Sequence, residues 1–134
     1  MALTRNWPLT LNYLGTSAAS VATGQNGYVV APFRGKIVEC GSVIGSATTT
    51  ADATVTVSIG ATAVTGGAFV ITQSGSAAGD KDYAATGDSN ANAVITGASG
   101  SNIANEGDVI KFAITGSGTG GGAVHCYVKM IKLA

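Results

Sequence analysis

One pattern in the sequence resembles a phosphate-binding loop. Gly116, Gly118 and Gly121 have the G-x-G-x-x-G spacing that lets backbone N–H groups approach a pyrophosphate, and they follow a predicted strand. In such a site a helix begins directly after the loop, and its N-terminus holds the phosphate. Here residues 123–133 have the alternation of another strand instead. We therefore interpret the glycines as a hairpin tip that requires positive φ angles.

His125 is the only histidine, so a serine–histidine or metal–histidine mechanism would have to use it. The G-x-S-x-G pattern of an activated serine does not occur in the sequence. Strand alternation places His125 with Tyr127 and Lys129, on the side that faces solvent or a partner. The sequence therefore indicates a surface or interface histidine, and it predicts no catalytic residue, no cofactor and no enzymatic activity.

Cys40 and Cys126 each lie among apolar residues of a predicted strand. Buried cysteines of this kind act as small hydrophobic side chains, and two cysteines without further ligands do not predict a metal site. A disulfide between them requires the two strands to be neighbours, and the sequence leaves that alternative open.

Several acidic residues occur in or beside the longest predicted loops. They are Asp80, Asp82, Asp88, Glu106 and Asp108. Oxygen ligands of this type bind hard cations such as calcium, but the spacing here matches no ordered calcium-binding loop. We interpret these residues as solvated loop acids, and no metal site is predicted.

Residues 52–72 define the fold class. Three apolar residues alternate there with three hydroxyl-bearing ones, which is the pattern of a half-buried strand. The apolar residues are Val55, Val57 and Ile59, and the others are Thr54, Thr56 and Ser58. A second strand is predicted at 68–72, and no charged residue occurs between Thr54 and Thr72.

Six more short strands are predicted. They cover residues 9–13, 28–33, 36–45, 93–96, 108–115 and 123–133, whereas most of residues 73–107 is predicted to be loop. Val, Ile and Thr are frequent, there are 20 glycines, and no helix is predicted. About eight strands between glycine-rich turns predict an all-β fold, a two-sheet antiparallel sandwich of the jelly-roll type.

The charge content is low and balanced. Seven basic and seven acidic residues make up 10% of the 134 residues, against the usual figure of about 25%. The basic residues form no cluster of the kind that binds nucleic acid. The longest apolar run, residues 28–33, is far shorter than the roughly 20 residues of a membrane-spanning helix. We predict one folded domain with neither a nucleic-acid nor a membrane partner.

Residues 1–27 are predicted to form an N-terminal extended arm and linker, followed by a single sandwich domain at 28–134. A segment of small, uncharged residues ends at the turn-forming pair Asn26–Gly27, which indicates the boundary between the arm and the domain. Two alternatives stay open: an arm that reaches over a neighbouring subunit, or an ordinary first strand of the same sandwich. The predicted partner-binding residues of this segment are Arg5, Trp7, Leu9, Leu11 and Tyr13.

Five segments from Ala31 onward carry a resemblance to a known family. In chain order they are APFRGKIVECGSV, TADATVTVSIGATAVTGGAFVI, SGSAAGD, EGDVIKFAITG and AVHCYVKM. Their style and order resemble the small β-sandwich decoration, or cement, proteins of tailed bacteriophages, which bind the outside of the capsid. Residues 1–27 lie outside the resemblance.

The resemblance implies a non-enzymatic structural protein of the virion. It implies that the chain is made in the host cytoplasm, associates as a homotrimer and binds the major capsid protein on the capsid surface, which it stabilises or decorates. The low charge agrees with this expectation, because copies of the chain would repel one another only weakly.

A second hypothesis comes from another class of protein. A glycan-binding module on a virion surface or tail fibre would use the loops of residues 73–107. Such sites need exposed rings that stack on sugar faces, and the candidate rings are Trp7, Tyr28, Tyr83 and Tyr127. Tyr83 and Asp88 are the residues whose substitution would distinguish the two hypotheses.

Overall fold

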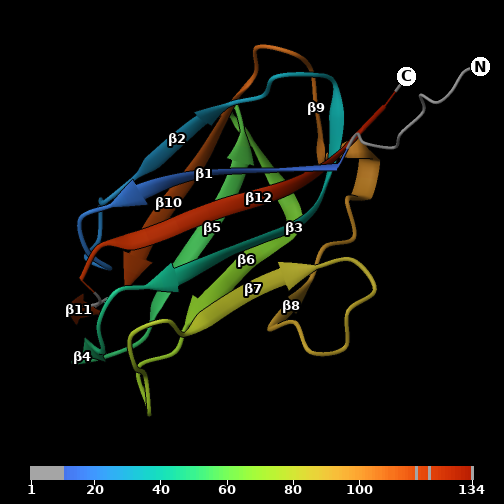
Figure 1. The fold of residues 1–134 in the computed structure, drawn as a ribbon. Coiled ribbons are helices and arrows are strands. Elements are labelled where there is room, and N and C mark those ends of the chain that lie inside the picture. Colours follow the sequence, from blue (N-terminus) through green and yellow to red (C-terminus); the bar gives the residue numbers. More distant parts are fainter. Residues whose placement is uncertain (1–10, 117, 121, 134) are drawn as a thin grey trace, which may run out of the picture.

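The computed structural model describes residues 11–116, 118–120 and 122–133, and these residues form two packed β-sheets (Figure 1). The larger sheet has the order β1-β12-β3-β7-β8, with β9 also paired to β3. Its strands are β1 (Leu11–Ala18), β12 (Val124–Lys132), β3 (Gly35–Ile44), β7 (Lys81–Ala85), β8 (Ala93–Val94) and β9 (Ile103–Ala104).

The smaller sheet has the order β2-β10-β5-β6. Its strands are β2 (Gly27–Val30), β10 (Val109–Gly116), β5 (Ala53–Ile59) and β6 (Thr62–Ile71). A separate two-stranded ladder joins β4 (Thr48–Thr49) to β11 (Thr119–Gly120), and a single 3₁₀ turn, η1, covers Ala98–Gly100. The predicted all-β sandwich is confirmed. Its strand pairs are antiparallel except β7–β8, which is parallel.

The strand order is nested in the manner of a jelly roll. The first and last strands, β1 and β12, pair in the larger sheet, while β2 and β10 pair in the smaller one. In the larger sheet β12 lies between β1 and β3, and in the smaller sheet β10 lies between β2 and β5. This alternation between two sheets is jelly-roll connectivity.

The core lies between the two sheets. β5 contributes Val55, Val57 and Ile59, and its hydroxyl-bearing residues face outward, as the alternation predicts. Phe69 and Phe112 are the largest fully buried side chains, and each contributes about 1.5–3 kcal/mol by leaving water. The inner side of β12 completes the core with Val124, Cys126, Val128 and Met130.

The structure contains a strand that the sequence pattern did not predict. β7 lies within the interval that was predicted to be mostly loop, and it pairs with β3 from Glu39 to Val43. Its sequence, KDYAA, has no apolar alternation, so periodicity gives no signal. The strand forms because the exposed edge of β3 offers a ladder of hydrogen bonds and because Ala84 fits a fully buried position.

Residues 11–18 form an ordinary strand of the sandwich. β1 pairs with β12 over eight consecutive residues, and Leu14 and Ala18 pack against the core. Of the two alternatives for this segment, the first-strand interpretation therefore holds for residues 11–18. The arm and linker predicted for residues 1–27 do not include β1. Residues 1–10, which include Arg5, Trp7 and Leu9, lie outside the described residues.

Cys40 and Cys126 are free and buried on adjacent strands. The register pairs Cys126 with Ser42 and Cys40 with Val128, so the two cysteines are not directly opposite. The structure decides the open alternative against a disulfide. Burial raises the pKa of Cys40 to about 12 and that of Cys126 to about 11.

We expect both thiols to resist a thiol reagent in the native protein and both to react after unfolding without reductant. Their ordinary pKa is 9.0, so above that pH the unfolded chain loses protons that the folded chain keeps. The free energy of unfolding should therefore fall as the pH rises from about 9 towards about 12, which urea unfolding would measure. Fast labelling of the native thiols, or fewer than two thiols after unfolding, would contradict this account.

Candidate interaction surface

The outer side of the larger sheet carries a cluster of aromatic and charged side chains, which we call the tyrosine face. Its members come from four adjacent strands and are Tyr13, Tyr127, Lys129, Glu39, Lys81 and Tyr83. Register aligns them in rows, because side chains of directly paired residues lie on the same side of a sheet. One row runs from Tyr127 through Gly41 to Tyr83, and another from Tyr13 through Lys129 to Glu39.

Tyr127 is buried although it lies on the outer side of the sheet. Its side chain is 7% exposed, and its register neighbours on β3 and β1 are Gly41 and Gly15. A Cβ atom at Gly41 would lie 2.7 Å from the Tyr127 hydroxyl and 2.7 Å from Tyr83 Cβ. The missing side chain at Gly41 therefore gives Tyr127 the space that it fills.

Glu39 is a buried carboxylate with two partners. The Tyr127 hydroxyl donates a hydrogen bond to Glu39 Oε2, and Lys81 Nζ lies 3.2 Å from the same oxygen. A carboxylate on a side chain that is 11% exposed needs such partners, because burial without them is costly. Desolvation, with the hydrogen bond to Glu39, raises the pKa of Tyr127, so this hydroxyl remains a donor at neutral pH.

Aromatic and cation–π contacts connect the remaining members of the face. The rings of Tyr13 and Tyr127 are tilted by 57°, with centroids 5.7 Å apart. Lys81 Nζ lies 4.2 Å from the centroid of Tyr83, and Lys129 Nζ lies 5.6 Å from that of Tyr13. Contacts of this kind contribute about 0.5–1 kcal/mol at exposed sites. They hold both lysines and both outer rings in defined positions.

Tyr83 also connects the face to the loop after β7. Its hydroxyl donates to Asp88 Oδ2 at 2.7 Å, and Asp88 Oδ1 accepts the N–H of Asn90 at 2.9 Å. Two hydrogen bonds lower the pKa of Asp88, first the one from the Asn90 N–H and second the one from the Tyr83 hydroxyl. The same hydrogen bond to Asp88 raises the pKa of Tyr83. The loop acid is therefore ionised and shapes a turn.

The structure brings together only some of the residues that the sequence singled out. Leu11 and Tyr13 are 47% and 62% exposed on the outer side of β1, and His125 is exposed on the same side of the sheet. Tyr83 and Tyr127 join them, whereas Tyr28 lies on the smaller sheet. Arg5, Trp7 and Leu9 lie outside the described residues.

Sequence reasoning missed the ionic part of the face. Glu39 and Lys81 are 42 residues apart in the sequence and become neighbours only through the pairing of β3 with β7. Strict alternation would put Glu39 on the same side as the core residue Ile37, and a bulge between these two residues turns Glu39 outward instead, so the sequence pattern gave no signal. Because β7 was not predicted, its partner could not be identified.

Of the other acids that the sequence singled out, Asp80 and Asp108 act in turns, whereas Asp82 lies on β7. Asp80 accepts the N–H of Ala77, and Asp108 accepts that of Asn105, both at 2.8 Å. Asp82 accepts the N–H of Thr72 at 3.2 Å. Across the described part of the chain, no group of three or more His, Cys, Asp or Glu side chains is placed to hold a metal ion.

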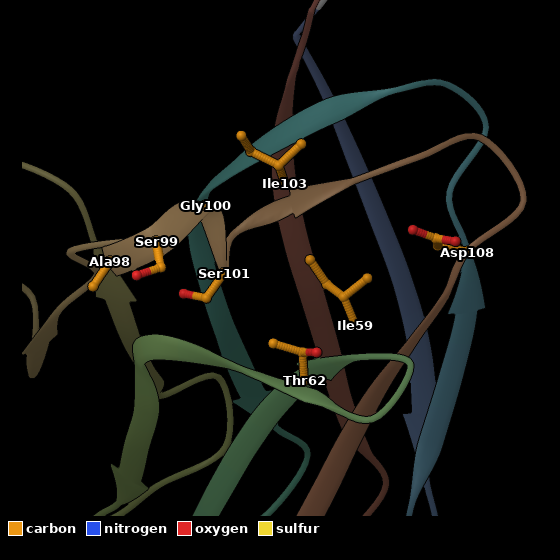
Figure 2. A pocket seen from close by; sticks show the side chains of 8 residues that line it. All are labelled: Ile59, Thr62, Ala98, Ser99, Gly100, Ser101, Ile103 and Asp108. Atoms are coloured by element: carbon orange, nitrogen blue, oxygen red, sulfur yellow. The ribbon is translucent and has the colours of Figure 1, made fainter.

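A separate hollow of about 370 Å³ lies where the β5–β6 hairpin meets residues 98–108 (Figure 2). It is lined by Ile59, Thr62, Ala98, Ser99, Gly100, Ser101, Ile103 and Asp108. Two of its polar groups are already engaged, since Ser101 bonds to Thr65 and Asp108 to Asn105. None of the lining residues belongs to the tyrosine face.

Comparison with protein-family models and with the curated proteins identifies no relative. No protein-family model matches the chain, and a search of the curated proteins finds no match. Among the described residues, no helix has the length and apolar character needed to cross a membrane. The class that the fold defines is that of jelly-roll β-sandwich proteins.

We expect Tyr127→Phe to lower the free energy of unfolding by about 1–3 kcal/mol, because the buried Glu39 carboxylate loses a donor. Urea unfolding at neutral pH would measure the effect. Tyr28→Phe is the matched control, since Tyr28 is 55% exposed and its change should remain within about 0.5 kcal/mol. Equal effects of the two substitutions would refute the role assigned to the Tyr127 hydroxyl.

Proposed function

We propose that the chain is a non-enzymatic structural protein of a phage virion, which binds the outer surface of the capsid through its tyrosine face. The partner is the major capsid protein, and the chain stabilises or decorates the shell. The proposal rests on the resemblance to decoration proteins, which also implies a homotrimer made in the host cytoplasm. Jelly rolls occur in viral capsid proteins and in lectins, so the fold alone does not choose between functions.

The observation that carries the proposal is the ordered tyrosine face. Tyrosines are frequent at the energetic centres of interfaces, where a rigid ring covers a large area at little entropic cost. Tyr13 is 62% exposed, while Tyr127 beneath it is fixed by Glu39. Such a face is ordered before binding, which reduces the entropic cost of association.

Other features of the chain support the same proposal. Charges are few and balanced, so a shell can carry many copies without strong repulsion between them. Weak individual contacts would then add through multivalency in an oligomer. The two free cysteines suit folding in a reducing compartment such as the host cytoplasm.

We expect Tyr13→Ser to weaken binding to capsid shells of the encoding phage by about tenfold or more, as for the loss of a central interface tyrosine. Co-sedimentation of purified chain with undecorated shells would measure the affinity. Val70→Ser is the control, because Val70 is exposed on the smaller sheet. Equal affinity of Tyr13→Ser and wild type would rule out the tyrosine face as the binding surface.

Shells that lack the protein should rupture at lower temperature or on dilution of salt, and adding the purified chain should restore their tolerance. The physical reason is that each bound copy stabilises the assembled state by mass action. Light scattering during heating would follow the rupture. Identical rupture thresholds with and without the chain would remove the stabilising role and leave decoration alone.

Glycan binding is the second candidate function, and the Tyr83–Asp88 pair is the observation that favours it. A ring and an ionised carboxylate lie together beside the loop after β7, as in sites that stack and hydrogen-bond a sugar. A glycan array would test this candidate with wild type, Tyr83→Ala and Asp88→Ala. A specific hit that both substitutions abolish would establish it, whereas a capsid-binding protein should give none.

A further inference from the structure

The charge that the tyrosine face exposes to solvent is positive. Lys81 and Glu39 form an ion pair there, but the side chain of Lys81 is 44% exposed and that of Glu39 only 11%. The pair therefore presents its cation outward and keeps its anion beneath. Lys129 is the register neighbour of both Tyr13 and Glu39. Lys36 lies on the same side of the sheet, since the next residue along β3 belongs to the core.

Most of the acidic side chains are engaged away from the centre of this face. All seven lie within the described residues. Five of them accept a backbone N–H group, and these are Asp52, Asp80, Asp82, Asp88 and Asp108. Only Glu39 and Asp88 bond to side chains of the tyrosine face. The three lysines on the outer side of the sheet outnumber these two carboxylates by one.

Both central lysines keep hydrogen-bond donors for a ligand. In the described part of the chain Lys81–Glu39 is the only ion pair, so Lys129 has no carboxylate within ion-pair distance. Lys129 Nζ lies over the ring of Tyr13 instead, and Lys81 Nζ lies over that of Tyr83. An aromatic face attracts a cation without supplying an acceptor oxygen, and an ammonium group has three N–H donors. The rings therefore position the two ammonium groups without saturating them.

We propose that the tyrosine face recognises an acidic segment of the shell protein, whose carboxylates bind the ammonium groups of Lys81 and Lys129. This inference rests on the proposed function and names the chemistry of its partner. Complementary charges across an interface steer the encounter and fix the register of the two proteins. Hydrogen bonds between an ammonium group and a carboxylate are also stronger than those between neutral groups.

An acidic protein segment fits this surface better than a nucleic acid does. Nucleic acid is bound by neutralising many phosphates, which requires a cluster of several cations. Here the lysines exceed the carboxylates by only one, and Asp88 beside Tyr83 would repel a polyanion. The rings of Tyr13 and Tyr83 provide the aromatic contact area that is typical of protein interfaces.

Co-sedimentation with undecorated capsid shells over a series of salt concentrations tests the proposal with a matched pair of variants. Lys129 and Lys111 are both half-buried, and each is the register neighbour of an exposed tyrosine, Tyr13 or Tyr28, on a different sheet. Binding of the wild type should weaken as salt rises, because salt screens exposed charges. Lys129→Gln should lower the affinity at low salt by about fivefold and reduce its salt dependence, whereas Lys111→Gln should match the wild type. Lys129→Arg, which keeps the charge, should retain most of the affinity.

Thermal unfolding followed by circular dichroism would show that each variant is folded. An affinity for shells that stays the same at every salt concentration would overturn the acidic partner. Equal binding of Lys129→Gln and the wild type would overturn it as well. Both outcomes would leave capsid binding itself in place.

If the chain does not bind shells, poly-L-glutamate separates this inference from the proposed function. Added to the free chain, it should protect Lys129 from acetylation more than Lys111, which mass spectrometry of the peptides would measure. Such protection without shell binding would contradict the capsid function alone. Equal protection of the two lysines, or none, would overturn the recognition of acidic segments too.

Discussion

Pairing of β12 with β1 on one side and β3 on the other is the interaction on which the structure depends. The inner side of β12 supplies Cys126, Val128 and Met130 to the core, and its outer side supplies Tyr127 and Lys129 to the tyrosine face. One strand therefore determines both the packing of the sandwich and the arrangement of its most ordered surface. Its central place in the sheet follows from the jelly-roll order, in which the last strand lies between the first and third.

This arrangement concentrates aromatic and charged side chains on the outer side of the larger sheet, in a chain without net charge. The tyrosine face, which we propose as the shell-binding surface, combines rings with lysines and a buried carboxylate that the Tyr127 hydroxyl and Lys81 neutralise.

Sequence periodicity was sufficient for the parts of the fold that alternate strictly. β5, β10 and β12 were predicted because apolar residues recur at every second position and face the core. β7 was missed because KDYAA has no such pattern and depends on the edge of β3. Burial of Tyr127 was missed for a related reason, since it requires Gly41 to be its cross-strand neighbour, and register is a tertiary property.

The proposal that the tyrosine face binds phage capsid shells is tested most directly by lysine labelling of the chain, alone and after mixing with such shells. Lys81 lies on the tyrosine face and Lys111 on the smaller sheet, so one experiment reports on both sides of the sandwich. The account predicts that acetylation of Lys81 falls when the chain binds, while that of Lys111 stays at the level of the free protein. Protection of Lys111 with unchanged labelling of Lys81 would contradict it.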